Sequence, residues 1–276
     1  MNSLLETSLK KLINKKIPNP HLDLRILLKH SSFNQEDIIL SNFDEKKIDT
    51  KIFYNFLKKR LNHEPISKII KRKQFWKYSF IVNKNVHDPR PETENIIEES
   101  LKLYCNKKNK ITILDIGTGS GCISISLAKE FNNSIITAID VSKKALEVAN
   151  KNTRLYQCKN QIKLEQNKLN NIKKKFDLIV CNPPYLSKKE YEKCSNEIKK
   201  YEPKIAFVGG IDGLKIYRNL AQKCPKLMKK NSYLVIEIGK NQLHSCKKIF
   251  KNSGLILKKV KKDLQNIDRT LIFEKI

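Results

Sequence analysis

The sequence predicts an α/β fold, in which helices cover a parallel sheet and a small helical domain precedes it. Three observations lead to this prediction. From residue 111 onward, short apolar runs alternate with helical stretches, as in parallel strands joined by crossover helices. The first run, residues 111–116, leads into a glycine-rich turn and then an apolar helix. Residues 1–73 contain no glycine and have the apolar spacing of helices.

The composition excludes several classes of protein. With 276 residues, the chain exceeds one typical domain, so we expect one large and one smaller domain. It has no apolar run long enough for a membrane span and no basic-then-apolar signal pattern at the amino terminus. Its 7 cysteines are odd in number and lack CxxC spacing, which argues against a disulfide framework or a zinc site. These features predict a cytoplasmic protein without a metal.

The formal net charge of +28 has two interpretations. A strongly basic chain is typical of proteins that bind nucleic acid. Lysine is spread along the whole chain, however, and asparagine and isoleucine are plentiful, as codon bias in an A+T-rich genome would produce. The charge alone therefore assigns no substrate.

The front of the chain, residues 1–73, is expected to fold into several helices, with Pro18 and Pro20 between the first two. The pattern fits a substrate-recognition domain and a cap that packs on its neighbour equally well. Residues 74–88 then change to aromatic and β-branched types, which predicts a β-hairpin connector with its turn at residues 83–85. The apolar helix faces comprise Leu5, Leu9, Leu12 and Ile13; Leu24, Leu27 and Leu28; and Ile52, Phe53, Phe56 and Leu57.

The segment from Asp88 to Glu94 reads DPRPETE, and Pro91 is well placed to begin a helix with two acids in its first turn. It has two interpretations. In the first, the segment serves only to start a helix. In the second, Arg90 and Glu92 also line a cleft.

The glycine turn, Gly117-Thr118-Gly119-Ser120-Gly121, joins a buried strand to a helix. Alternate glycines let the backbone approach a ligand closely, and the helix amino terminus presents N–H groups to it. The spacing is GxGxG, not the GxGxxG of dinucleotide sites, and no GK[ST] follows, which argues against NAD and ATP.

A second predicted strand, residues 134–139, ends in Asp140, about 20 residues after the glycine turn, where an acid typically accepts hydrogen bonds from ribose hydroxyls. Asp115, just before the turn, either braces its amides or meets a ligand amine. A helix at 142–152 and a strand near 162–165 follow, and Asn167 and Lys168 lie in the next loop.

The stretch Asn182-Pro183-Pro184-Tyr185 follows a buried strand at 176–181. Proline fixes its own φ and extends the preceding residue, so Asn182 is held at the carboxyl end of the strand, where open α/β sheets bind ligands. The Asn182 amide oxygen and the Pro183 carbonyl are two acceptors suited to an NH2 group, which the ring of Tyr185 can cover. A proline-stiffened turn is the alternative.

We call Asn182–Tyr185 the clamp. Beyond it, residues 201–213 form an irregular segment, and a loop of this length often covers a site. Alternating elements complete the α/β half. We expect helices at 214–228 and 240–252 and strands at 233–238, 255–260 and 270–273.

DIGTGSG at 115–121, Asp140 and NPPY at 182–185 resemble a class I S-adenosylmethionine-dependent methyltransferase that acts on a planar amino group. Six further strings narrow the resemblance to one family within this class. They are EPI (64–66), FW (75–76), PRPETE (89–94), YEP (201–203), GGIDGL (209–214) and EIG (237–239). The chain is similar, essentially end to end, to the peptide chain release factor glutamine methyltransferase family.

This resemblance implies a Rossmann-like seven-stranded sheet with an antiparallel last strand in residues 89–276, joined by the hairpin to the helical domain. It implies methylation of the glutamine in the Gly-Gly-Gln loop of release factors by a cytoplasmic monomer that needs no membrane or nucleic acid. Carried over by position, Gly117 to Gly121 would hold the methionine part of S-adenosylmethionine, Asp140 its ribose, and Asn167 and Lys168 would lie near its adenine. Asn182 would bind the target carboxamide and face the cofactor, with Pro183, Pro184 and Tyr185 completing the pocket.

The chain departs from the family at four positions. Asn167 stands where the family has aspartate, so a neutral acceptor replaces a charged one and we expect weaker cofactor binding. His63 and Lys71 stand where glycines are usual, and Asp88 replaces an apolar residue.

Two other functions remain open. NPPY is shared with adenine-amino methyltransferases of DNA or RNA, which must extract their base from the stack; against this, no separate basic recognition domain follows the clamp. A cofactor-binding partner protein without catalytic activity is the other alternative, although the intact clamp speaks against it.

Overall fold

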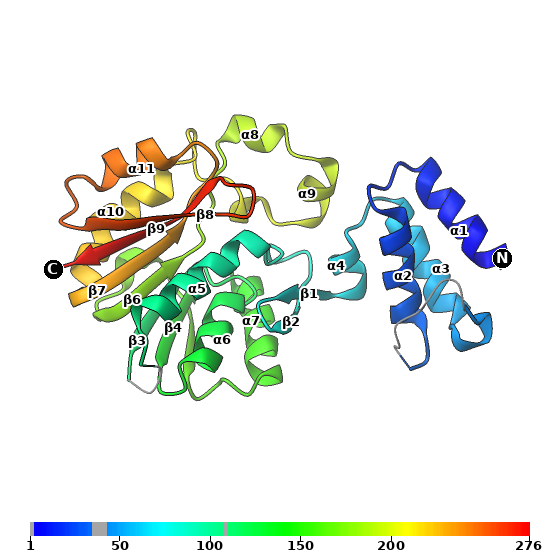
Figure 1. Ribbon diagram of the computed structural model, residues 1–276, viewed down its shortest axis with the longest axis horizontal. Coiled ribbons are helices and arrows are strands. Elements are labelled where there is room, and N and C mark those ends of the chain that lie inside the picture. Colours follow the sequence, from blue (N-terminus) through cyan, green and yellow to red (C-terminus); the bar gives the residue numbers. More distant parts are fainter. Residues whose placement is uncertain (1–2, 35–42, 107–109) are drawn as a thin grey trace. The chain divides into compact units, whose positions relative to one another are not determined.

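The structure, a computed structural model, describes residues 3–34, 43–106 and 110–276 (Figure 1). The part of the predicted helical domain at 35–42 lies outside the described residues. The chain forms two compact units. The helical unit comprises Met1–Arg72 with Asn196–Tyr201, and the sheet unit comprises Lys73–Ser195 with Glu202–Ile276.

The helical unit packs its helices around one apolar core. Leucines and one aromatic ring form most of this core, including the fully buried Leu12, Leu27 and Phe53. Ile13 and Ile52, which were expected on the buried faces, are exposed, because each lies one position beyond the narrow apolar stripe of its helix. The elements are α1 (Ser3–Asn14), α2 (Pro20–Ser31), η2 (Glu45–Lys47), α3 (Thr50–Leu61) and α4 (Ile66–Ile70).

A sixth piece of the helical unit, α9 (Asn196–Tyr201), comes from far along the sequence. Its Glu197 carboxylate accepts a hydrogen bond from Arg60 at 2.9 Å, and the same buried guanidinium donates to Asp23 at 2.6 Å. Two carboxylates therefore compensate the burial of one arginine. The sequence analysis assigned no element to residues 196–200, and the predicted irregular segment begins at the last residue of α9.

The predicted hairpin is present as β1 (Arg72–Phe75) and β2 (Tyr78–Ile81). Its turn is at Trp76, which has a φ of 55°, and not at residues 83–85, which form a separate turn after the hairpin. Side-chain contacts stabilise the unusual conformation, because the Trp76 backbone N–H donates to Glu94 at 2.6 Å and its indole N–H to Glu130 at 2.8 Å. The prediction of the turn was wrong because these carboxylates lie outside the local sequence.

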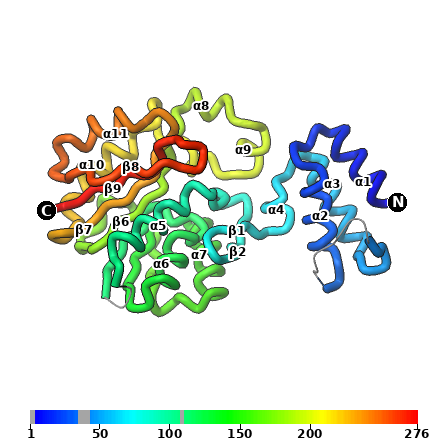
Figure 2. The backbone as a smooth tube through the Cα atoms, in the orientation of Figure 1, coloured from blue at the N-terminus to red at the C-terminus, as the bar shows by residue number. Residues whose placement is uncertain are grey.

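The sheet unit contains a seven-stranded sheet in the order β5-β4-β3-β6-β7-β9-β8. The strands from β5 to β7 are parallel, and β9 is antiparallel to both of its neighbours, which confirms the predicted class I architecture. The last strand, red in Figure 2, lies between β7 and β8. The strands are β3 (Thr112–Ile116), β4 (Ile135–Asp140), β5 (Ile162–Gln166), β6 (Phe176–Cys181), β7 (Met228–Glu237), β8 (Ile256–Lys262) and β9 (Asp268–Lys275).

Helices cover both faces of this sheet (Figure 1). Along β3, Ile113 packs toward one apolar cluster and Leu114 toward the other, as the period of a strand requires. One face carries α5 (Glu94–Leu103), α6 (Cys122–Glu130) and α7 (Lys143–Leu155); the other carries α10 (Lys215–Leu227) and α11 (Leu243–Phe250). Short segments η3 (Pro91–Thr93), η4 (Leu169–Asn171), α8 (Lys188–Glu192) and η5 (Lys204–Ala206) lie in the connections.

Candidate active site

The carboxyl ends of β4, β3 and β6 lie side by side, because the three strands are parallel neighbours. The loops that follow them surround a cavity of 650 Å³, within the usual size of a small-molecule site. Most of the predicted site residues line it, namely Gly117, Thr118, Gly119, Ser120, Asp140, Asn167, Lys168, Asn182, Pro183, Pro184 and Tyr185.

The glycine turn forms one wall of the cavity. Gly117 and Gly119 have φ values of 75° and 57°, a conformation that favours glycine. A Cβ on Gly117 would meet no atom within 4 Å, so open space adjoins this backbone. The amides of Gly117 and Thr118 donate to the carbonyl of Ile139 at 2.9 and 3.0 Å, which ties the turn to β4. A bound molecule can therefore lie directly against the main chain.

Asp140 ends β4 beside this turn. Its carboxylate accepts from the backbone N–H of Gly119 at 3.0 Å and of Ser142 at 2.8 Å, one bond to each oxygen. Burial raises the pKa of Asp140, while these backbone hydrogen bonds lower it. Because each carboxylate oxygen has a second lone pair, the group can still accept from ligand hydroxyls.

Asp115 braces the turn from within. It is fully buried, and one carboxylate oxygen accepts from the hydroxyls of Thr118, at 2.7 Å, and Ser124. It does not line the cavity. Of the two roles considered for Asp115, these contacts support bracing, through the side-chain hydroxyls of Thr118 and Ser124.

Asn182 follows β6 and is held by side chains from two other segments. Its Nδ2 donates to the hydroxyl of Thr93 at 2.9 Å, and that hydroxyl donates to the Glu237 carboxylate at 2.6 Å. Burial raises the pKa of Glu237 to about 7, although the hydrogen bond from Thr93 acts to lower it. The backbone of the clamp is also held, because Gln242 donates to the carbonyl of Tyr185 at 2.8 Å.

Asn167 lies in the loop after β5. Its side-chain oxygen accepts from the backbone N–H of Lys168 at 2.9 Å and from the side chain of Asn171 at 3.0 Å. Its own backbone N–H donates to the carbonyl of Asp140 at 3.1 Å. The loop is thereby ordered against the end of β4, on the wall of the cavity.

Arg90, Glu92 and Gly121 are predicted site residues that do not line the cavity. Gly121 instead is the N-cap residue that precedes α6, with a φ of 82°. Arg90 pairs with Glu202 at 2.8 Å, and His87 contacts the same carboxylate at 2.7 Å. Although burial alone would raise the pKa of Glu202, the hydrogen bond and electrostatic interaction with His87 and the charge of Arg90 lower it to about 2. These contacts join the DPRPETE segment to the loop that follows Glu202.

That loop lies against the backbone of the clamp. The Leu186 N–H donates to the carbonyl of Phe207, and the Gly209 N–H donates to the carbonyl of Leu186, both at 2.8 Å. A Cβ on Gly209 would approach the Pro184 carbonyl oxygen to 2.3 Å, closer than side chains allow. The glycine therefore permits direct contact between the GGIDG segment and the clamp.

Sequence reasoning did not identify several residues that line the cavity, among them Val86, Thr93, Phe207 and Lys215. Thr93 was part of the DPRPETE string, but nothing in the local pattern connects it to Asn182, 89 residues away. Phe207 is an aromatic residue within the irregular loop, which is a weak signal for a residue that covers a site.

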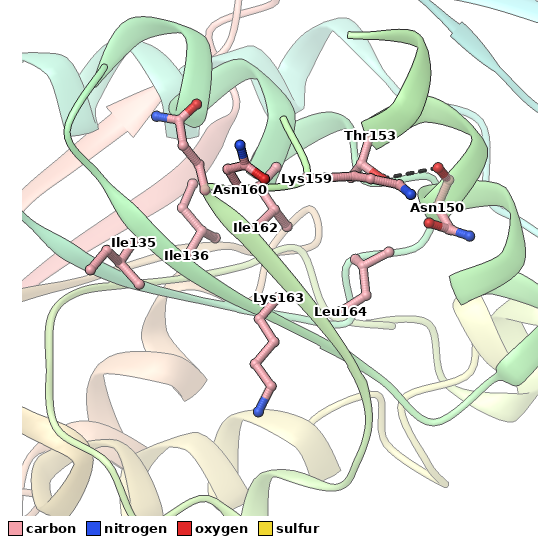
Figure 3. A pocket seen from close by; sticks show the side chains of 10 residues that line it. Ile135, Ile136, Asn150, Thr153, Lys159, Asn160, Ile162, Lys163 and Leu164 are labelled. Atoms are coloured by element: carbon pink, nitrogen blue, oxygen red, sulfur yellow. Dashed lines mark hydrogen bonds between the residues drawn. The ribbon is translucent and has the colours of Figure 1, made fainter. Parts of the chain in front are cut away.

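A second hollow, of 390 Å³, lies along the edge strand β5 (Figure 3). Ile135 and Ile136 lie on one side of it, and Lys163 extends from the strand. Among its lining residues, the charged side chains are Lys159 and Lys163, and both are exposed. Among its lining residues the buried polar one is Thr153, whose hydroxyl donates to the carbonyl of Asn150 at 3.0 Å.

The part of the chain that the structure describes has neither a metal-binding cluster nor a membrane-spanning helix. Within residues 3–34, 43–106 and 110–276, no group of three or more His, Cys, Asp or Glu side chains could hold a metal ion. Over the same ranges, no helix has the length and apolar character needed to cross a bilayer.

Known proteins resemble this chain in sequence and in fold. Residues 99–231 match the family described as "Methyltransferase small domain". A "Bifunctional methyltransferase" of Rickettsia bellii is 36% identical over 284 residues, which cover 92% of this chain and 51% of that protein. The chain thus spans about half the length of the Rickettsia relatives it matches.

A solved structure of the hMettl16 catalytic domain with MAT2A 3'UTR hairpin 1 has a TM-score of 0.54 at 17% identity, and covers 69% of this chain and 71% of that chain. This similarity concerns the fold alone. A "Release factor glutamine methyltransferase" of Caulobacter vibrioides is 33% identical over 260 residues, which cover 93% of this chain and 90% of that protein. The chain belongs to the release factor glutamine methyltransferase family.

Proposed function

We propose that this protein transfers a methyl group from S-adenosylmethionine to the side-chain amide nitrogen of the glutamine in the Gly-Gly-Gln motif of peptide chain release factors, and so modulates translation termination. One observation carries the proposal: Asn182, with its side-chain amide, lines the same cavity as the glycine turn. Family membership supports the choice of substrate. The protein would act in the cytoplasm as a monomer.

The residues of the cavity fit S-adenosylmethionine. The open space beside Gly117 accommodates the amino-acid part of the cofactor, Asp140 retains lone pairs for ribose hydroxyls, and the loop at Asn167 and Lys168 forms a wall for the adenine. When bound, the cofactor supplies an electrophilic methyl group on a sulfonium. S-adenosylhomocysteine is the product of breaking the bond between sulfur and the methyl group, and the methylated nitrogen releases one proton to solvent after transfer.

The clamp binds and orients the target amide. A carboxamide nitrogen is a poor nucleophile because its lone pair is delocalised into the carbonyl. The Asn182 side-chain oxygen and the Pro183 carbonyl would accept its two N–H bonds, and the half-buried Tyr185 ring would cover its planar face. Orientation of this kind supplies about 7–11 kcal/mol of barrier reduction in favourable cases. Accepting these hydrogen bonds also stabilises positive charge that develops on the nitrogen.

The two units would have different roles in the reaction. The predicted domain at residues 1–73 would recognise the release factor, residues 74–88 would connect the domains, and residues 89–276 would perform the transfer. In this division, Arg90 and Glu92 would act at the substrate side of the site, Arg90 through its ion pair with Glu202.

The experiment that tests the function is methylation of defined substrates. Purified protein with labelled cofactor is incubated with a release factor, with a variant whose Gly-Gly-Gln glutamine is alanine, and with duplex DNA. We expect one methyl on the glutamine of the first substrate only, located by mass spectrometry. Label on DNA alone would overturn the proposal and support an adenine-amino methyltransferase. Cofactor binding without transfer to any substrate would support a catalytically idle binding protein.

A further inference from the structure

Three side chains from distant parts of the sequence form a continuous hydrogen-bonded chain behind the clamp. Thr93 is in η3, Asn182 follows β6, and Glu237 ends β7. Asn182 Nδ2 lies 2.9 Å from Thr93 Oγ1, which lies 2.6 Å from Glu237 Oε2. Thr93 and Glu237 are buried, each with 2% of its surface exposed. Water therefore has little access to compete for these bonds.

The chemistry of the three groups fixes the direction of each bond. An ionised carboxylate can only accept, and a hydroxyl has a single proton to donate. When Thr93 donates that proton to Glu237, its oxygen can only accept from Asn182. The Asn182 amide must then turn its NH2 group toward Thr93, so its oxygen is the atom available to the cavity.

We propose that Glu237 and Thr93 are positioning residues, which together hold the Asn182 side-chain amide with its oxygen, rather than its NH2 group, facing the substrate carboxamide. This inference rests on the proposed function. The reversed amide would direct donors at the NH2 group of the substrate, and the nitrogen would no longer be held for transfer. Neither residue needs to touch the substrate for this role.

The surroundings of Glu237 bear on its proton. The Tyr185 hydroxyl is a further hydrogen-bonding partner of its carboxylate, and the charge of Arg269, from β9, favours the ionised form. The charge of Glu92, from η3, opposes it, and burial has the largest effect and raises the pKa to about 7. A protonated Glu237 can itself donate to Thr93, which removes the constraint on Asn182. The alignment of the clamp is therefore expected to weaken as Glu237 gains its proton.

A set of three variants separates positioning from packing. Thr93→Val removes the hydroxyl and keeps the shape, Thr93→Ser keeps the hydroxyl, and Thr270→Val is the matched control. Thr270 pairs with Glu237 across β7 and β9, and its buried hydroxyl has no hydrogen-bond partner in the described part of the chain. We expect Thr93→Val to lower kcat about tenfold or more with an unchanged Kd for S-adenosylmethionine, while Thr93→Ser and Thr270→Val keep most of the wild-type kcat.

Two kinetic results would overturn the inference. One is a wild-type kcat in Thr93→Val, which would show that the hydroxyl is dispensable. The other is an equal loss in Thr93→Val and Thr93→Ser, which would indicate packing. Thermal denaturation of every variant verifies that it is folded.

A second measurement does not depend on methyl transfer. In protein labelled with ¹⁵N-asparagine, the Asn182 side-chain NH2 signal is assigned by its loss in Asn182→Ala. We expect this signal to move with pH with a midpoint near the Glu237 pKa in the wild type, and to lose that response in Glu237→Gln and Thr93→Val. We call the hydrogen-bonded chain from Glu237 through Thr93 to Asn182 the relay. A signal that is insensitive to pH and to both substitutions would refute the relay even in an active enzyme. A responsive signal in a protein that methylates no release factor would support the relay and reject the proposed substrate.

Discussion

The side-chain amide of Asn182 makes the most direct contribution to the proposed reaction. It lines the cavity, as Thr93 does, and its NH2 group is held by the Thr93 hydroxyl, which is in turn bonded to Glu237. We expect Asn182→Ala to lower kcat by about 10²–10³-fold or more, because one preorganised polar contact in an active site is typically worth this much. Calorimetry should show S-adenosylmethionine binding within a few fold of wild type. Asn160→Ala, in the second hollow, is the matched control; a near-normal kcat in Asn182→Ala would contradict the assigned role.

Asn167 lies on the wall of the cavity, at a position where the sequence resemblance predicts an aspartate. Hydrogen bonds to charged groups contribute roughly 1.5–3 kcal/mol and those to neutral groups 0.5–1.5 kcal/mol. We therefore expect Asn167→Asp to tighten S-adenosylmethionine binding about fivefold, as measured by calorimetry. Asn171, whose side chain now donates to Asn167, can also donate to the introduced carboxylate, so the loop should keep its shape. Unchanged or weaker binding would show that this side chain does not contribute to the cofactor site.

Two helix ends in the helical unit carry strain that glycine would relieve. His63 and Lys71, at positions where the sequence resemblance predicts glycine, have φ values of 59° and 57°. Lys71 is the left-handed cap of α4, a position at which glycine is favoured. Each change to glycine should raise the free energy of unfolding by about 0.5–1 kcal/mol, because the strain relieved exceeds the entropy that glycine adds to the unfolded chain.

Urea denaturation measures both changes. Lys58→Gly, at an exposed position inside α3, should have the opposite sign and cost about 1 kcal/mol. Destabilisation by Lys71→Gly would show that the lysine side chain makes a compensating contact.

The loop that carries GGIDG supports the clamp through its backbone. A Cβ on Gly209 would lie 2.3 Å from the Pro184 carbonyl oxygen and 2.7 Å from that of Gly213. Because neither neighbour is a flexible side-chain end, the backbone must shift in Gly209→Ala. We expect kcat to fall about tenfold or more, with less effect on cofactor binding.

The matched control for this loop is Gly254→Ala, where a Cβ meets nothing within 4 Å. It carries the strain of a positive φ without a clash near the site, so its kcat should be that of the wild type. Equal kcat values for the two variants, in protein shown to be folded, would mean that the loop does not support the clamp.

Across the whole molecule, the features that could be predicted are those formed by residues close together in the sequence. The strands, the glycine turn and the clamp each occupy a continuous stretch, and the common edge follows from the parallel order of β4, β3 and β6. It did not predict contacts that only folding creates. Thr93 and Glu237 are 144 residues apart, and the Trp76 turn depends on carboxylates from α5 and α6.

Two buried carboxyl groups of the sheet unit should give stability opposite dependences on pH. The pKa of Glu237 is raised from 4.5 to about 7 in the folded protein, mainly by burial. Between these values the folded state holds a proton that the unfolded state has lost, so stability falls as pH rises. Glu202 is the reverse case, because its pKa is lowered to about 2 by its hydrogen bonds and by its electrostatic interactions with His87 and Arg90. Its stabilisation is complete above about 4.5 and is lost as pH falls toward 2.

The substitutions Glu237→Gln and Glu202→Gln test these signs. Relative to the wild type, Glu237→Gln should gain unfolding free energy as pH rises from 5 to 8, by up to roughly 3 kcal/mol, because a neutral amide carries no charge to bury. Glu202→Gln should be less stable than the wild type at neutral pH, because the partners Arg90 and His87 lose their carboxylate. Urea denaturation at several pH values measures both differences. A parallel pH dependence of Glu237→Gln and the wild type would mean that Glu237 ionises at an ordinary pKa, and the relay would then keep its direction throughout this range.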